Sequence, residues 1–166
     1  GTDQGKGGIV VQGTKNVGLS LSKQMGSNLI GNISNLNISV NGSEGIGVLR
    51  RSDYAQTGNM VFTGTHIQTL DFGANATKSV LLRSDNGNIT LDRNITINKG
   101  LGNNVVLQAN GAGTSIINNT LRTMTLDTGA KTSIGLLASG GGSLDNKGTV
   151  VVTEEKSQGI AVLSGA

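Results

Sequence analysis

The sequence predicts an all-β protein, a right-handed parallel β-helix (β-solenoid) of about five to six coils with three short strands per coil. Three observations lead to this fold class. Short aliphatic segments recur along the whole chain, apolar residues alternate with Thr, Ser or Asn within them, and no segment of useful length has a helical period. The 166 residues include 27 Gly, no Pro and no Cys, and aromatic residues make up 2% of the chain.

The first strand family, arm A, consists of aliphatic runs that follow Gly, Ser or Asn. Successive members lie about 25 to 38 residues apart, a spacing typical of solenoid repeats. The long first interval makes the segment Thr14–Gly26 a candidate insertion or cap. The members of arm A are Gly8–Val11, Gly45–Leu49, Ser79–Leu82, Asn104–Leu107, Ser133–Leu137 and Gly159–Leu163.

Two further strand families complete each repeat. Arm B is the weaker one and follows arm A, at Asn28–Ile30, Met60–Thr63, Asn88–Leu91, Ser115–Ile117 and Ser143–Leu144. Arm C precedes each return to arm A, at Leu36–Asn41, His66–Asp71, Asn94–Asn98, Met124–Asp127 and Val150–Thr153. Gly, Asn and Asp separate the arms, as expected at the corners of a coil.

The composition fits this architecture. Pro would remove backbone N–H groups from ladders in which every interior strand is paired on both sides. Gly and Asn tolerate the left-handed backbone of tight corners, and stacked small aliphatic side chains fill a narrow core. We therefore expect one domain, residues 1–166, as a single β-helix segment cut from a longer rod, without disulfides and without a cofactor.

Two arm C members continue almost identically, as Thr69–Ala74 and Thr125–Ala130, so we expect them to occupy the same place in two coils. On this alignment a polar residue follows the last apolar residue of each arm C. These residues are expected to hydrogen-bond their own corners. The alternative is that Asp71 and Asp127, about 9 to 10 Å apart, act as acid and base on a sugar. The expected column contains Asn41, Asp71, Asn98, Asp127 and Thr153.

A second column follows arm A, where an Arg-Ser-Asp triplet recurs at Arg51–Asp53 and Arg83–Asp85, with Arg50 before the first copy. One interpretation is a solvated corner with local Arg–Asp pairs, which stabilise little. The other is a patch that recognises the carboxylate or sulfate groups of a host glycan, because the guanidinium fork suits such anions. The candidate ligand-binding residues are therefore Arg50, Arg51, Arg83, Asp53 and Asp85.

Other chemical signals are weak. The single histidine, His66, has no Cys and no second His beside it, so neither a zinc site nor a Ser-His hydrolase is expected. The Gly-rich segment Ser139–Ser143 is expected to be a corner. The formal charge of +3 is spread along the chain without aromatic interleaving, so no nucleic-acid partner is expected. No apolar run reaches membrane-spanning length, so this segment is not expected to insert into a membrane.

At this level the sequence resembles the β-helical passenger domains of bacterial type V autotransporter adhesins, particularly the fusobacterial-type surface proteins. The residues that carry the resemblance are Gly45–Leu49, Gly159–Leu163 and Ser143–Val152, together with the absence of Cys and Pro. The resemblance implies a rod displayed outside the outer membrane at the bacterial cell surface. It implies attachment to host glycans, host protein receptors or surface proteins of other bacteria.

These observations lead us to expect a non-catalytic segment that mediates or spaces attachment. A β-helical lyase or hydrolase acting on polysaccharides and a vacuolating-toxin-like passenger are the alternatives. An enzyme of this fold would need a groove with several clustered ionisable groups, and none is visible in the sequence. Because an open coil end exposes unpaired strand groups, we also expect that the segment can associate end to end.

Overall fold

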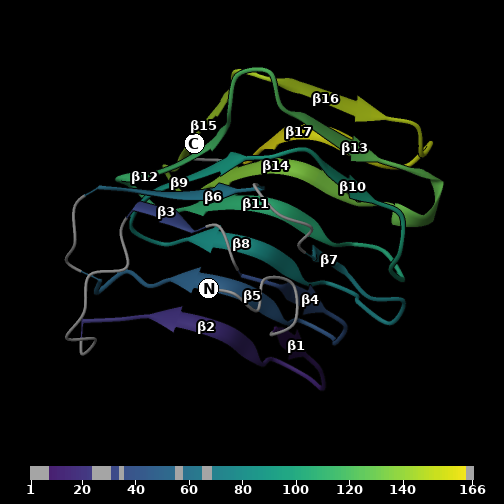
Figure 1. Ribbon diagram of the computed structural model, residues 1–166, viewed down its shortest axis with the longest axis horizontal. Helices are drawn as coiled ribbons and strands as arrows, with labels where there is room; N and C mark the ends of the chain where they lie inside the picture. Colours follow the sequence, from purple (N-terminus) through teal and green to yellow (C-terminus); the bar gives the residue numbers. More distant parts are fainter. Residues whose placement is uncertain (1–7, 24–30, 34–35, 55–57, 65–68, 164–166) are drawn as a thin grey trace.

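The computed structural model describes residues 8–23, 31–33, 36–54, 58–64 and 69–163 of this chain. These residues form a parallel β-solenoid with almost no helix. Figure 1 shows the strands stacked in one direction, from β2 near the N-terminus to β16 and β17 near the C-terminus. Every strand pair in the described part of the chain is parallel, which confirms the predicted fold class.

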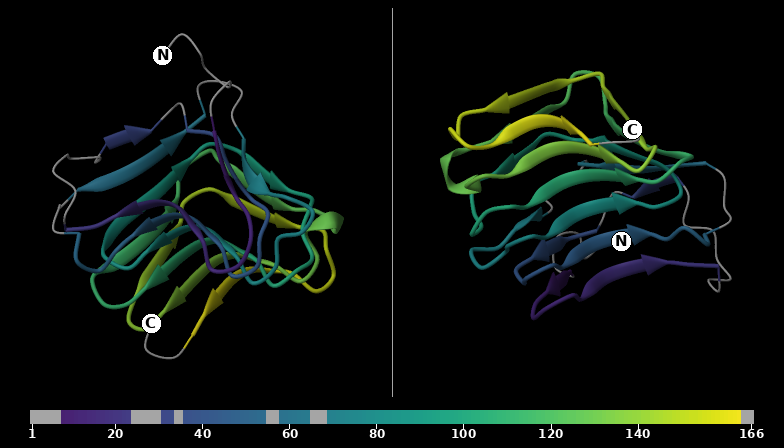
Figure 2. Two further views of the ribbon diagram at one scale, coloured as in Figure 1. Left: turned by 90° about the horizontal axis from the view of Figure 1, so that it is seen from below. Right: turned by 180° about the vertical axis from the view of Figure 1, so that it is seen from behind.

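Arm A forms the longest ladder, and the right view of Figure 2 shows its strands stacked in chain order from purple to yellow. Its six strands are β2 (Val17–Leu21), β5 (Ile46–Arg50), β8 (Val80–Ser84), β11 (Val105–Asn110), β14 (Ile134–Ser139) and β17 (Gln158–Val162).

Arms B and C form the other sides of the coil. The five arm B strands are β3 (Gly31–Ile33), β6 (Asn59–Thr63), β9 (Gly87–Asp92), β12 (Thr114–Asn118) and β15 (Ser143–Asn146). Arm C is divided into two ladders of three, namely β1 (Ile9–Val11), β4 (Ile38–Val40) and β7 (Leu70–Phe72), then β10 (Ile95–Ile97), β13 (Thr123–Leu126) and β16 (Thr149–Val152). The helical element η1 (Thr128–Ala130) has three residues, and no helix among the described residues could span a membrane.

The core consists of stacked aliphatic side chains from all three arms. One arm A column shows the principle, because its four middle members are fully buried at equivalent places of successive turns. Each such side chain packs between the like residues above and below it. The members of this column are Leu19, Val48, Leu82, Leu107, Leu136 and Ile160.

The number of turns differs slightly from the expected five to six. The solenoid makes about four turns. The five-stranded arm B ladder contains four steps from strand to strand, and arm C also has four hydrogen-bonded steps. Between its two ladders arm C is interrupted, because β7 and β10 lie next to each other without hydrogen-bonded pairing.

The first strand does not belong to the arm that its sequence indicated. Ile9–Val11 pairs with Ile38–Val40 and is therefore an arm C strand, whereas the first arm A strand is Val17–Leu21, which pairs with β5. The prediction of an insertion or cap at Thr14–Gly26 is therefore wrong for its described part. Both arms use similar Ile/Val runs, and only the pairing partner distinguishes them.

The match between Thr69–Ala74 and Thr125–Ala130 also misaligns two coils, by two residues. Val80 and Ile134 are aligned through β11, and Phe72 and Leu126 each lie eight residues before them. Ala76 and Ala130 then coincide, and both are fully buried. Phe72, and not Leu70, is therefore equivalent to Leu126. A shift of two residues preserves the alternation of inward and outward side chains, so the sequence pattern did not reveal it.

The interruption of arm C coincides with a change in corner length. Six residues, 64–69, connect β6 to β7, whereas only Arg93 and Asn94 connect β9 to β10. Gly64 allows the short corner to approach, because a Cβ on Gly64 would lie 2.8 Å from the Cβ of Arg93. The side chain of Arg93 is thereby positioned beside the end of β6.

Candidate functional site

Arg50 does not belong to a surface patch. It occupies an inward position aligned with Leu21 and Ser84, and its side chain is fully buried. Its Nη1 donates hydrogen bonds to the carbonyl oxygens of Gly58 (2.8 Å) and Asn88 (3.1 Å). The guanidinium lies 5.5 Å from the ring centre of Tyr54, a cation–π contact. Burial lowers the pKa of Arg50, and its hydrogen bonds hold neighbouring turns together.

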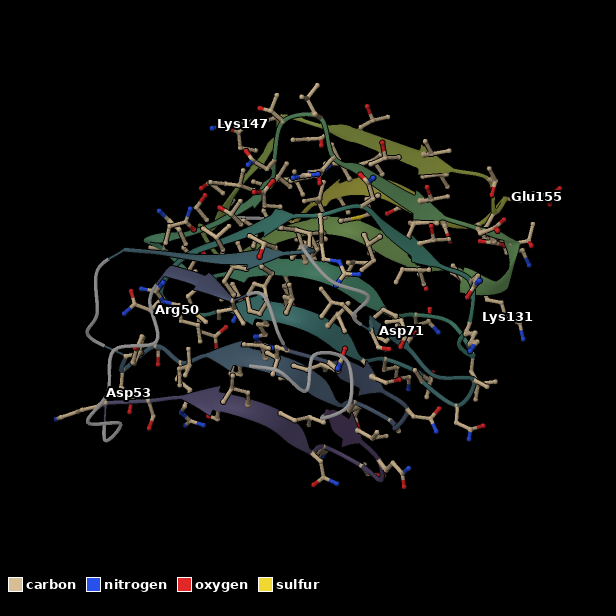
Figure 3. All side chains as sticks on the ribbon, in the orientation of Figure 1. Arg50, Asp53, Asp71, Lys131, Lys147 and Glu155 are labelled. Atoms are coloured by element: carbon tan, nitrogen blue, oxygen red, sulfur yellow. The ribbon has the colours of Figure 1, made fainter. Side chains whose placement is uncertain are left out.

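This position of Arg50 corrects the prediction that it binds a ligand. The reason lies in Gly87, whose φ of +78° and missing side chain leave room for the guanidinium, since a Cβ there would collide with it. Arg50 is the fifth residue of β5, and the strand directs the side chain at this position into the core even though it is charged. Figure 3 shows Arg50 and Asp53 on the side of the solenoid where arm A passes into arm B.

The two Arg-Ser-Asp triplets do not stack on each other. Arg83 is aligned with Leu49, and Ser84 with Arg50, so the copies are displaced by two residues. Arg83 instead binds Asp85 within its own triplet, with Nε–Oδ1 and Nη2–Oδ2 distances of 2.7 and 3.3 Å. Arg51 and Asp53 form a looser, exposed pair, with 3.9 Å between Nε and Oδ1. The geometry corresponds to local pairs at a corner.

The expected polar column after arm C is present only in part. Asn98, Asp127 and Thr153 are aligned, and Oδ1 of Asp127 accepts hydrogen bonds from the Thr128 N–H (2.8 Å) and the Thr153 hydroxyl (3.1 Å). Asn41 makes the equivalent corner contact one ladder earlier, where its Oδ1 accepts the N–H of Asn75 (2.9 Å). Only the contact between Asp127 and Thr128 lies within one corner, as expected, whereas the contacts of Asn41 and Thr153 join neighbouring turns.

Asp71 lies outside this column. It pairs with Ser39 in the middle of β7, because of the two-residue displacement described above. The proposed acid–base pair of Asp71 and Asp127 assumed that the two residues shared one column, so it loses its geometric basis. Figure 3 shows Asp71 away from the corner that carries Lys131 and Glu155.

A buried polar ladder precedes arm A. Ser79 and Asn104 are fully buried, and each accepts a backbone N–H from the preceding turn, with Gly45 N to Ser79 Oγ at 3.0 Å and Ser79 N to Asn104 Oδ1 at 3.0 Å. Ser133 N donates to Ser157 Oγ (2.9 Å) in the same way. The polar groups of these side chains are engaged in hydrogen bonds with the backbone at this corner, so they serve the structure of the corner.

The remaining sequence candidates provide no reactive cluster. His66 lies outside the described residues. Ser139 donates to Asn110 Oδ1 (3.0 Å) and Ser143 to the carbonyl oxygen of Thr114 (3.1 Å), so both hydroxyls serve neighbouring turns. Within the described part of the chain, no group of His, Cys, Asp and Glu side chains could hold a metal ion.

A polar pocket of about 290 Å³ lies where arm B passes into arm C, at the interruption of the arm C ladder. Its principal feature is a pair of stacked arginines. Ile95 is aligned with Met124, so Arg93 and Arg122, each two residues earlier, occupy equivalent places of adjacent turns. Neighbouring turns are about 4.8 Å apart. The lining residues are Thr63, Gly64, Asp92, Arg93, Asn94 and Arg122.

Acidic groups accompany both arginines of this pocket. Arg122 Nε donates to Asp92 Oδ1 at 2.9 Å, and this hydrogen bond holds the pKa of Asp92 below its ordinary value. Burial lowers the pKa of Arg93, and the nearby Asp71 acts in the opposite direction. Asn94 fixes the corner, because its Oδ1 accepts the N–H of Thr123 (2.8 Å). The pocket therefore presents two guanidinium groups on a backbone held by hydrogen bonds.

Sequence reasoning missed Arg93 and Arg122. A signal was present, since the two arginines are one repeat apart and both lie just before an arm C strand. The Arg-Ser-Asp repetition attracted attention instead because its residues are consecutive. Stacking in a solenoid depends on the distance to the next strand, and here that distance is equal for Arg93 and Arg122.

No family model, curated protein or solved structure matches this chain at a significant level.

Proposed function

We propose that this chain is a non-catalytic β-helical segment of a surface-exposed bacterial adhesin, located outside the outer membrane, which mediates or spaces attachment to host cells or other bacteria. The observation that carries the proposal is the stacking itself. Similar strands repeat along the solenoid, and the polar groups of its corners are largely consumed by hydrogen bonds between turns. A spacer needs this kind of regular, extended scaffold, and the resemblance to autotransporter passengers supports the same proposal.

The partners proposed for this segment are a host glycan, a host protein receptor or a surface protein of another bacterium. The shape of the scaffold supports an extended contact surface, since solenoids offer long lateral faces built from successive turns.

The last coil supports a further part of this proposal, in which copies associate end to end. Three residues of the last coil are aligned with buried core residues of the preceding turn but are themselves exposed. They are Val152, Ile160 and Val162, with 36%, 46% and 59% exposure. The corner Thr153–Ser157 before β17 has five residues, like the corner Gln12–Asn16 before β2. The first coil of a second copy therefore has the corner length needed to continue the stack.

The test uses fluorescently labelled chain added to host epithelial cells and to bacteria, with bound protein measured over a range of concentrations. Saturable retention is expected, and unlabelled chain should compete for it. Absence of saturable binding to every surface, at concentrations where the chain stays folded by circular dichroism, would contradict an attachment role for this segment.

The same protein sample distinguishes the alternative functions. Release of reducing ends from a panel of polysaccharides would favour a hydrolase or lyase and overturn the non-catalytic proposal. Leakage of dye from liposomes would favour a toxin-like passenger. Neither signal is expected from a spacer or an adhesin.

A further inference from the structure

We propose that the pocket at Arg93 and Arg122 binds the carboxylate or sulfate group of an acidic sugar. This inference rests on the proposed function, because it names the chemical class of receptor that an adhesin of this structure would recognise. The pocket is distinct from the Arg50–Asp53 and Arg83–Asp85 corners, which lie after arm A.

Asp92 orients the guanidinium group of Arg122. Its Nε is held by Asp92 at 2.9 Å, and within the described part of the chain its two terminal Nη groups have no protein acceptor. Asp92 thus positions the guanidinium through one edge and leaves the Nη donors at the pocket. A guanidinium held in this way offers paired N–H groups that match a carboxylate or sulfate.

The charges of the residues that line the pocket favour an anionic ligand. Arg93 and Arg122 occupy equivalent places in adjacent turns, and among the described lining residues Asp92 is the acidic one. The described lining therefore contributes two cations and one carboxylate, and Asp71 lies near Arg93 outside it. An anion in the pocket would be attracted by both arginines, whose backbone positions are about one strand spacing apart.

The hydrogen-bonding groups beside the arginines suit the neutral part of the ligand. Thr63, Asn94 and the carboxylate of Asp92 offer hydrogen-bonding groups beside the arginines. Asp92 accepts hydrogen bonds only, so it suits hydroxyl groups next to the anionic group. The cavity of about 290 Å³ is near the lower end of the range for small-molecule sites. A single acidic sugar ring fits this combination better than a free inorganic ion, which would use the arginines alone.

The experiment measures binding of soluble probes to the whole chain by isothermal titration calorimetry and by ¹⁵N NMR of the arginine Nε–H groups. The probes are galactose 6-sulfate against galactose, sialyllactose against lactose, and inorganic sulfate. We expect the acidic sugars to bind, the neutral sugars to bind at least about tenfold more weakly, and the resonance of Arg122 Nε–H to shift. Comparison of the sulfated and sialylated probes distinguishes sulfate from carboxylate recognition.

Variants locate the site. Arg122→Gln should weaken binding of the acidic sugar about tenfold to hundredfold, since a charge-assisted hydrogen bond is lost. Arg122→Lys keeps the charge but loses the fork, so it should also bind more weakly than the native chain. Arg51→Gln is the matched control, because it removes another surface arginine, 53% exposed against 41% for Arg122, from the other corner, and the affinity should be unchanged.

Asp92→Asn tests the positioning role. If only net charge attracted the ligand, removing a carboxylate would strengthen binding. We expect weaker binding, because the neutral amide oxygen of Asn would hold Arg122 Nε less strongly than the carboxylate does. Tighter binding in Asp92→Asn, or unchanged binding in Arg122→Gln, would overturn the proposed arrangement. Circular dichroism and thermal melts would confirm that each variant is folded.

The outcomes separate this inference from the proposed function. If the native chain binds cells but shows equal affinity for galactose and galactose 6-sulfate, the pocket inference is wrong and the adhesin proposal stands. If acidic sugars bind at Arg122 but no cell surface retains the chain, the pocket is confirmed and the attachment role fails. Binding of inorganic sulfate as tight as that of the sugars would show that the pocket recognises a free anion and would overturn the sugar inference.

Discussion

The two ends of the solenoid use the same inward columns but differ in exposure. In the first coil, Val11 and Leu21 are 3% and 0% exposed. In the last coil, Ile160 and Val162 are 46% and 59% exposed, although Val162 belongs to the same column as Leu21. The difference teaches that one inward column can be fully buried in one terminal coil and half exposed in the other, so burial depends on what covers a coil as well as on the strand pattern.

The corners of the two ends differ in charge. The last corner contains Glu154, Glu155 and Lys156, whereas the first contains Lys15 as its only charged residue. Glu154 accepts hydrogen bonds from the N–H groups of Thr132 (3.0 Å) and Lys156 (3.1 Å) and from the Ser157 hydroxyl (2.8 Å). The last corner is therefore held to the preceding turn by a carboxylate, whereas the first corner is held to the following turn by backbone hydrogen bonds, such as Lys15 N–H to the Ser43 carbonyl oxygen (2.9 Å).

The largest expected effect compares one column at its middle and at its open end. Leu107→Ala should lower the free energy of unfolding by about 2–5 kcal/mol, because it creates a cavity between two turns. Ile160→Ala, in the same column, should cost well under half of that, since nearly half of the side chain is already exposed. Urea unfolding monitored by circular dichroism measures both. Equal costs would show that the last coil is covered in solution.

A smaller effect is expected from the buried charge beside the first coils. Arg50→Met keeps much of the volume but removes the hydrogen bonds to the carbonyl groups of Gly58 and Asn88. We expect a loss of about 1.5–3 kcal/mol, the usual contribution of hydrogen bonds from charged groups. Thermal unfolding provides the measurement, with Arg51→Met as the exposed control. An unchanged melting temperature would mean that packing alone holds these turns.

The open end should also control self-association. Ile160→Lys together with Val162→Lys places charges on the exposed columns, so concentration-dependent association should decrease about tenfold or more, given the apolar area removed from the contact. Sedimentation velocity over a range of concentrations measures this. The matched control, Val10→Lys with Val17→Lys, changes outward residues of the first coil and should have a smaller effect. A strictly monomeric native chain would contradict end-to-end stacking.

The smallest expected effect is a pH dependence confined to the last corner. The hydrogen bond from the Ser157 hydroxyl, together with backbone N–H groups, holds the pKa of Glu154 below its ordinary value of 4.5. The stabilisation is therefore complete above that value and is lost as the pH falls through the lowered pKa. Hydrogen exchange at the amides of Thr132 and Lys156 should accelerate there after correction for intrinsic rates. Glu154→Gln should remove the effect, and the first corner should show none.

Much of the fold could be predicted from the sequence. The aliphatic runs, their alternation with Thr, Ser and Asn, and the absence of Pro predict a parallel solenoid of three strands per coil, and the structure confirms these features. The strands around Val80, Val105 and Ile134 coincide with the predicted arm A. Alternation has this predictive value because burial of one strand face requires a period of two, whatever the neighbouring strands are.

Which residues come together at the candidate site depends on the register between strands of neighbouring turns, and the sequence pattern does not determine that register. The sequence pattern placed Asp71 in a column with Asp127 because a displacement of two residues preserves alternation. It placed Arg50 at the surface because the residue is charged, and charged residues are rarely buried. Arg93 and Arg122 were not recognised as neighbours, because the corners before them differ in length.

The sequence by itself determined the short strands and their tendency to alternate between core and surface, since that property is local and follows from the pleat. Arm A departs from strict alternation, because consecutive residues such as Leu81 and Leu82 are both fully buried. Only the tertiary structure decided which residue of one turn lies over which residue of the next. That choice depends on hydrogen bonds between strands about one repeat apart and on the fit of single side chains, such as Arg50 against Gly87 or Arg93 against Gly64. The proposed sugar pocket exists because these contacts place two arginines on adjacent turns.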